Sequence, residues 1–406
     1  MSNQINLIKD FKIFALTTDP VYIGTGGYTI GRVDNTIVRD PITKVPKIPG
    51  SSLAGVWRYY TTLEIINRLK ARDIKFVDDS GRNIRERIKK LDRETIKDKI
   101  ENWISDKNNN WDNSTKSDWY FFNGNTLIDL TCAGQDNVPQ EELANITATN
   151  KEGKTGHCGH CLVCKGFGFS KKDISWQGLI FFSDLNILFF PVFTMRGTKW
   201  ITTVRKLEEI GMKTGDLSEP ADNKVLTKNG NEGHINLGWL YLEVENKSFT
   251  SDLQNVMLNN FRLKEEDIVI VPESLFSHIV SSNLEVRTSV SIDPITGAAK
   301  EGALFTSEAI PRGTILYGNV RIFDKSSFNG VDSKLQPLPD LDKLECALKE
   351  SKHFFEILGI GGMTTRGFGR IKIVFEQELE KKCVEEANST DNSNTQSSQQ
   401  TNMQGG

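Results

Sequence analysis

Apolar and polar positions alternate along several short stretches of the chain, and a period of two predicts β-strands. The first such stretch covers residues 9–18, and the most apolar part of the sequence covers residues 178–204. Further strand patterns follow toward the C-terminus at Ile235–Val244, Asp267–Val271, Glu285–Ile292, Thr314–Phe323 and Arg370–Phe375. Because strand patterns outnumber helical ones and their order is mixed, we expect an α+β fold rather than a doubly wound sheet.

Helical spacing of apolar positions occurs in three places. The first predicted helix begins at Ser51 and Ser52, whose hydroxyls can cap it, and runs to about Leu69. Residues 80–106 are heavily charged with a thin apolar stripe. This pattern is typical of a solvated amphipathic helix, and an RNA-facing surface is the alternative. A late helix is predicted over Lys343–Leu358.

Composition and charge narrow the class of protein. The chain has 406 residues, of which 25% are charged, and this length is sufficient for one elaborated domain or two. Apolar runs stay well short of the roughly 20 residues that span a bilayer, and the N-terminal residues have no signal-peptide pattern. We therefore expect a cytoplasmic protein without a membrane partner. The net charge of −3 excludes a globally basic nucleic-acid-binding protein, but a groove needs only local positive charge.

Two glycine-rich segments near opposite ends of the chain combine residue types that bind RNA. They cover residues 24–58 and residues 359–373. Glycine lets a backbone approach a phosphate closely, neighbouring cationic side chains neutralise it, and hydroxyls at a helix start add donors. The candidate RNA-binding residues are Gly26, Gly27, Arg32, Arg39, Lys47, Ser51, Ser52, Arg58, Gly361, Gly362, Thr365, Arg366 and Arg370. Because most of the chain lies between the segments, we expect the fold to bring them together.

Cysteine and histidine crowd into one short run, which consists of His157, Cys158, His160, Cys161 and Cys164. Thiolates at two-residue gaps can surround one tetrahedral zinc ion, and a reducing cytosol favours a metal over disulfides. The fourth ligand stays open among His157, His160 and Cys132. Buried thiols without metal and an iron–sulfur cluster are the alternatives.

Asp34 is the candidate for chemistry because it stands in the first glycine-rich segment. A carboxylate can accept the proton of a ribose 2′-hydroxyl, or it can hold a divalent metal ion that promotes the attack. The alternative is a loop aspartate that only binds its own turn. Asp40 precedes Pro41 and is interpreted as a turn residue of this kind.

Four ordered blocks of sequence carry a family resemblance. The first is Gly31-Arg-Val-Asp-Asn-Thr-Ile-Val-Arg-Asp-Pro with Pro46-Lys-Ile-Pro-Gly-Ser-Ser-Leu-Ala-Gly-Val-Trp-Arg, and the last is Gly361-Gly-Met-Thr-Thr-Arg-Gly-Phe-Gly. Between them lie blocks at residues 182–202 and 285–313. Together the blocks resemble the RAMP superfamily, specifically the repeated backbone subunit of type III CRISPR RNA-guided effector complexes.

The resemblance implies an architecture. We expect a ferredoxin-like core, a variant of the RNA-recognition motif, over residues 1–70 and 171–385. The core includes a β-hairpin thumb at about 272–316, and residues 71–170 form a helical, zinc-binding insertion. Residues 386–406 are of low complexity, and we expect them to be disordered.

The resemblance also implies an activity. Copies of such a subunit stack along a CRISPR guide RNA beside other effector subunits, and target RNA paired to the guide is cut beside each thumb. Asp34 matches the aspartate that is essential for this cut. The resemblance therefore implies a metal-dependent endoribonuclease that uses Mg²⁺ or Mn²⁺ for cleavage, and a zinc ion with a structural role. On the thumb, we expect Arg287 to contact the RNA backbone. Val286, Val290 and Ile292 are expected to point outward and wedge between bases, and packing of these three residues in the core is the alternative. A non-catalytic scaffold subunit and a guide-processing ribonuclease are the alternatives.

Overall fold

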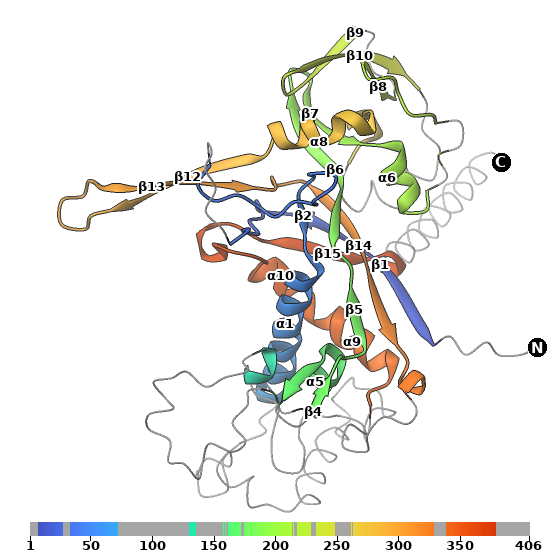
Figure 1. Ribbon diagram of the computed structural model, residues 1–406, viewed down its shortest axis with the longest axis vertical. Coiled ribbons are helices and arrows are strands. Elements are labelled where there is room, and N and C mark those ends of the chain that lie inside the picture. Colours follow the sequence, from blue (N-terminus) through green and yellow to red (C-terminus); the bar gives the residue numbers. More distant parts are fainter. Residues whose placement is uncertain are drawn as a thin grey trace, which may run out of the picture. The chain divides into compact units, whose positions relative to one another are not determined.

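The computed structural model describes much of the chain outside two long stretches, one between residues 71 and 157 and one after residue 378 (Figure 1). The described residues are 7–26, 33–71, 130–134, 157, 159, 161–171, 174–212, 214, 217–228, 233–247, 261, 263–328 and 338–378. The chain divides into two compact units. Unit 1 comprises Met1–Asp10, Gly50–Ser183 and Val320–Phe354, and unit 2 comprises Phe11–Pro49, Asp184–Asn319 and Phe355–Gly406.

Unit 2 is built on a mixed β-sheet whose strands follow the order β15-β1-β14-β6-β7-β11-β8-β10-β9, with β2 also paired to β6. The strands are β1 (Ile8–Thr17), β2 (Lys47–Ile48), β6 (Leu185–Thr194), β7 (Gly197–Thr202), β8 (Lys224–Thr227), β9 (Gly233–Leu237), β10 (Leu240–Asn246), β11 (Ile268–Ile270), β14 (Ile315–Phe323) and β15 (Ile371–Phe375). Most residues of β6 are buried, as expected of a central strand with both faces covered. The short helices are α6 (Val204–Glu209), η5 (Glu265–Asp267), α8 (Glu273–Ser282) and η8 (Thr364–Arg366).

A separate two-stranded hairpin in unit 2, which we call the thumb, consists of β12 (Glu285–Ile292) and β13 (Ala299–Ala309). Figure 1 shows it as a long ribbon that extends beyond the end of α8. The strands pair antiparallel, with Val290 opposite Leu304 and Thr288 opposite Thr306. Side chains on one face of the hairpin stay in solvent, and Leu304 is 65% exposed. The predicted outward alternation of apolar residues in this hairpin is confirmed.

Unit 1 packs two long helices, α1 (Gly50–Ala71) and α9 (Leu341–Ser351), against each other. The indole of Trp57 on α1 donates to the carbonyl of Leu348 at 3.1 Å and to the hydroxyl of Ser351 at 3.2 Å. Its ring also lies 5.5 Å from that of Phe182. The other elements are η2 (Leu130–Ala133), α5 (Leu162–Phe167), β3 (Phe169–Lys171), β4 (Ile174–Trp176), β5 (Ile180–Phe182) and η6 (Lys325–Phe328), while α10 (Phe354–Ile357) begins at the unit's last residue.

Most predicted elements are confirmed, and two predictions are wrong in detail. The strand predicted over Ile235–Val244 is the hairpin β9–β10, because the chain turns at Gly238 with a positive φ of 65°. The helix predicted over Lys343–Leu358 breaks after Ser351 and resumes as α10. The helix predicted over 80–106 and the tail at 386–406 lie outside the described residues. Among the helices that the structure describes, each is too short or too polar to cross a membrane.

Candidate nucleic-acid interface

The C-terminal glycine-rich loop packs directly on the chain that leads into the first glycine-rich segment. The amide of Gly362 donates to the carbonyl of Tyr22 at 2.9 Å, and that of Gly369 donates to Pro20 at 2.8 Å. A Cβ atom on Gly361 would lie 2.2 Å from the Tyr22 carbonyl oxygen, and its φ is +86°. Glycine is therefore required at this position by both space and backbone conformation. Within unit 2 the C-terminal loop therefore contacts the residues that lead into the first segment.

Arg287 joins the thumb to the C-terminal glycine-rich loop. Its Nη1 donates to the carbonyl of Gly367 at 3.2 Å, and its guanidinium lies 4.8 Å from the centre of the Phe368 ring. Its Nε donates to Glu285 at 2.6 Å. These contacts tie the base of β12 to the C-terminal loop within unit 2.

Asp34 lies against β13, the second strand of the thumb. Its Oδ2 accepts two hydrogen bonds from Thr306, one from the backbone amide at 2.8 Å and one from the hydroxyl at 2.9 Å. The amide of Asp34 also lies 3.1 Å from the same hydroxyl oxygen, to which it donates. The Thr306 amide, and then its hydroxyl, lower the pKa of this exposed carboxyl below its usual value. Asp34 is therefore an anion at neutral pH.

The residues after Asp34 continue along β13. The amide of Asn35 donates to the carbonyl of Thr306 at 3.0 Å, and the amide of Glu308 donates to the carbonyl of Asn35 at 2.9 Å. Arg39 then forms an ion pair with Glu308 at 2.6 Å. The predicted phosphate ligand Arg39 thus has a carboxylate partner, and it holds the segment after Asp34 against the thumb.

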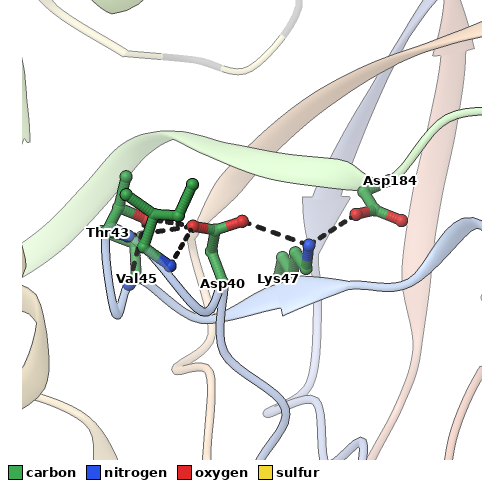
Figure 2. A network of polar contacts seen from close by, with 6 residues as sticks. Asp40, Thr43, Val45, Lys47 and Asp184 are labelled. Carbon is green, nitrogen blue, oxygen red and sulfur yellow. Dashed lines mark hydrogen bonds and ion pairs between the residues drawn. The ribbon is translucent and has the colours of Figure 1, made fainter.

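Lys47 and Asp40 form a second cluster on the same segment (Figure 2). Asp40 Oδ1 accepts from the amides of Ile42 at 3.0 Å and Thr43 at 2.9 Å, which confirms the predicted turn. Chiefly the Thr43 amide lowers the pKa of Asp40 to about 2. The Lys47 amine lies between Asp40 at 3.3 Å and Asp184 at 2.7 Å, and the hydrogen bond to Asp184 is the main cause of its raised pKa.

The remaining candidate RNA-binding residues differ in how accessible their polar groups are. Arg366 and Thr365 are exposed on the C-terminal loop, and within the described part of the chain Arg366 has no ion pair. Arg370 lies 3.4 Å from Asp19. Gly26 is exposed in the first segment, and Gly27 and Arg32 lie outside the described residues. Ser51 and Ser52 lie in the first turn of α1, which begins at Gly50 in unit 1.

Three of the predicted metal ligands form a cluster in unit 1. The sulfur atoms of Cys132, Cys161 and Cys164 lie within 4.8 Å of one another, and all three residues are buried. Buried His157 is not part of this group, and its Nδ1 lies 2.9 Å from Nη2 of Arg58. Cys158 and His160 lie outside the described residues. Three thiols placed in this way are of the kind that binds zinc.

Arg58 lies at this cysteine cluster. Its Nε donates to the carbonyl of Cys132 at 2.7 Å, and its Nη1 donates to the carbonyl of Gly168 at 2.6 Å. Nη2 lies 3.9 Å from the sulfur of Cys164. The predicted phosphate ligand Arg58 is thus bound at the cysteine cluster.

Sequence reasoning missed the partners of Asp34 and Arg39. Thr306 and Glu308 fall in the block of residues 285–313, but nothing in that block marks their side chains as partners of residues 272 and 269 positions away. Only the alternation of β13 could have placed both on one face of the strand.

A protein family and two known proteins match this chain. The RAMP superfamily profile matches residues 15–372. The CRISPR system Cmr endoribonuclease Cmr4 of Pyrococcus furiosus is 24% identical over 236 residues, which are 51% of this chain and 72% of that protein. The CRISPR system Cms endoribonuclease Csm3 of Methanothermobacter thermautotrophicus is 38% identical over 65 residues, which are 16% of this chain and 26% of that protein.

A solved structure was also matched. A chain of the Type III-B Cmr-beta complex bound to cognate target RNA has a TM-score of 0.48 and 11% identity, covering 91% of this chain and 98% of its own. Because the family profile covers most of the sequence, the chain belongs to the RAMP superfamily.

Proposed function

We propose that this protein is a repeated backbone subunit of a type III CRISPR interference complex, where it binds guide RNA and cleaves the paired target RNA at regular intervals. Its partners are the guide RNA, the target RNA, further copies of itself and other effector subunits. The family match and the names of the two relatives, both endoribonucleases, support this assignment. The observation that carries it is an exposed carboxylate, Asp34, at the base of a hairpin with solvent-exposed apolar side chains.

The arrangement of strands supports a ferredoxin-like core. Along the chain the core elements follow the order β1, α1, β6, β14, α9 and β15. In the sheet the four strands follow the order β15-β1-β14-β6. This is the β-α-β-β-α-β pattern, with the last strand beside the first, that defines a ferredoxin-like unit. In this proposal the thumb is a hairpin inserted before β14.

RNA contacts are assigned by exposure and charge. The C-terminal loop offers Arg366 to a phosphate, and its glycines allow the RNA backbone to approach. Val286, Val290 and Leu304 form an apolar face on the thumb that can separate stacked bases. Arg39 and Lys47, which already have carboxylate partners, are assigned to holding the protein segment in place.

Cleavage is assigned to attack of a ribose 2′-oxygen on the adjacent phosphorus. The new P–O2′ bond gives a 2′,3′-cyclic phosphate as the P–O5′ bond breaks, the 2′-proton passes to water, and the leaving 5′-oxygen takes a proton from water. A bound Mg²⁺ or Mn²⁺ would neutralise charge on the phosphate. A lowered pKa makes Asp34 a weak base, so its proposed task is to hold such a cation or orient its water.

The cysteine cluster is proposed as a structural zinc site. Cys132, Cys161 and Cys164 supply three thiolates, and His157 is the described candidate for the fourth ligand. We expect about one zinc per chain by mass spectrometry of the purified protein. Cys161→Ala should lose that zinc and lower Tm, while Cys346→Ala, at an exposed cysteine on α9, should keep it. Equal zinc content in both variants would exclude the site.

A guided cleavage assay tests the proposed function. The guide-loaded assembly is incubated with labelled complementary RNA, and products at regular spacing are expected from the wild type but not from Asp34→Ala. Binding of guide and target should be equal in both. If the wild type binds without cutting, the protein is a scaffold subunit; if it cuts precursor guide RNA instead, it is a processing ribonuclease.

A further inference from the structure

Asp34 takes its position from the thumb rather than from its own loop. Each hydrogen bond described for its carboxylate side chain comes from Thr306 on β13. The next residue, Asn35, bridges to Ser307 in parallel register, so two consecutive residues of the loop are bound to consecutive residues of the thumb. Five residues after Asp34, the ion pair between Arg39 and Glu308 joins the same loop to β13.

The hydroxyl of Thr306 has a role that few side chains can fill. It donates to Asp34 Oδ2 at 2.9 Å and accepts from the Asp34 amide at 3.1 Å. Only a group that is both donor and acceptor can close this small ring, which restricts the position to a hydroxyl side chain. Both bonds from Thr306 to the carboxylate fall on Oδ2, and this leaves Oδ1 as the oxygen that can face a cation or water.

Thr306 also shares a face of the thumb with the exposed apolar residues. Positions two apart on a strand point to the same side, so Leu304, Thr306 and Glu308 lie in one row. Leu304 is opposite Val290 and lies about 7 Å along the strand from Thr306. The side chains that face solvent and the residue that holds Asp34 are therefore parts of one hairpin.

We infer that Thr306 is a positioning residue that fixes Asp34 to the thumb, so that the site where the hairpin enters the RNA sets the site of the cut. This inference rests on the proposed function, because it assigns Thr306 a task in the cleavage that Asp34 serves. Movement of the thumb moves the carboxylate with it, and a loop detached from β13 loses the geometry for cleavage.

Three substitutions test the inference in the guide-loaded assembly with labelled target RNA. Thr306→Val removes the hydroxyl but keeps the shape and the backbone amide, and we expect its cleavage rate to fall about tenfold, the typical effect of losing a charge-assisted hydrogen bond. Thr306→Ser restores the hydroxyl and should cleave within about twofold of the wild type. Thr288→Val is the control, because Thr288 is exposed opposite Thr306 on the partner strand.

Target affinity separates positioning from misfolding. All three variants should bind target RNA as the wild type does, so that the loss in Thr306→Val appears in kcat alone. If Thr306→Val cleaves normally while Asp34→Ala does not, the inference is wrong and the proposed function stands. Equal losses in Thr306→Ser and Thr306→Val, or a loss in Thr288→Val, would also overturn it. A wild-type assembly that does not cleave at all removes both claims.

Discussion

Asp34 and Asp40 are six residues apart on one segment of unit 2, and they are held in opposite ways. Asp40 accepts hydrogen bonds from its own turn, at Ile42 and Thr43, and an ion pair from Lys47. Asp34 is held by Thr306, 272 residues away, and its side chain is exposed. The pKa of each is lowered by backbone amides, so their electrostatics alone do not separate them.

The difference lies in where the hydrogen bonds come from. A carboxylate that binds the amides of the residues just after it stabilises a local turn, and this role is common to many turns. The carboxylate of Asp34 instead joins its loop to a distant strand, and both hydrogen bonds from Thr306 use the same oxygen, Oδ2. The second arrangement is the one expected of a functional group.

The largest expected effect comes from replacing each carboxylate by its amide. Asp34→Asn keeps the size of the side chain but removes its charge, and we expect guided cleavage to fall by about 10²–10⁴-fold. Asp40→Asn should leave cleavage within about twofold of the wild type. Rates under single-turnover conditions provide the measurement, and equal losses in both variants would erase the distinction.

The next test concerns the packing of the C-terminal glycine-rich loop against the chain before Asp34. Gly361 packs on Tyr22 at the entry to the Asp34 loop, and Gly361→Ala combines a positive φ with a clash against backbone. We expect the free energy of unfolding to fall by about 2–4 kcal/mol. Gly26→Ala is the control, since its φ is +77° but nothing lies within 4 Å of the added carbon. Its expected loss is only about 1 kcal/mol, and similar denaturation midpoints would contradict the steric argument.

A smaller effect is expected from pH, through Asp40. Its folded pKa of about 2 is below the unfolded value of about 3.9, so the carboxylate stabilises the fold above pH 4. That contribution disappears as pH falls toward 2. Because the site is near the surface, Asp40→Asn should cost only about 1 kcal/mol at pH 7, and wild type and variant should converge near pH 2. If urea unfolding gives the same difference in stability between wild type and Asp40→Asn at pH 7 and near pH 2, the assignment is wrong.

The smallest effect concerns salt. Arg366 is exposed and has no ion pair among the described residues, whereas Lys47 lies between two carboxylates. Arg366→Met should therefore reduce the slope of log K for guide-RNA binding against log salt by about 0.7. Lys47→Met should leave the slope unchanged. If Lys47→Met changes this slope more than Arg366→Met does, Lys47 binds a phosphate of the RNA.

The alternation of apolar residues was sufficient to predict most of the sheet. The strands β1, β6, β12, β14 and β15 and the helix α1 lie where the patterns indicate. The pattern failed at Gly238, where a two-residue turn interrupts a stretch that reads as one strand. It also did not indicate α8, whose ten residues fall between two strand patterns.

The candidate site was predictable only by residue type. Glycines and Asp34 were found because their chemistry is visible in the sequence, and Gly362 contacts Tyr22 just before the first glycine-rich segment. The partner of each charge was not predictable. Arg39 and Arg58 look alike as cations near glycine, yet one pairs with Glu308 and the other lies beside Cys132, because pairing depends on tertiary contacts.

The separation between Asp34 and Thr306 has a consequence during synthesis of the chain. The ribosome makes Asp34 first, and its partner Thr306 follows 272 residues later. At about 5–20 residues per second, the carboxylate waits tens of seconds for β13 to emerge. Until then the growing chain exposes Asp34 without the partner that holds its carboxylate, so the arrangement of Asp34 against the thumb forms only after β13 has been made.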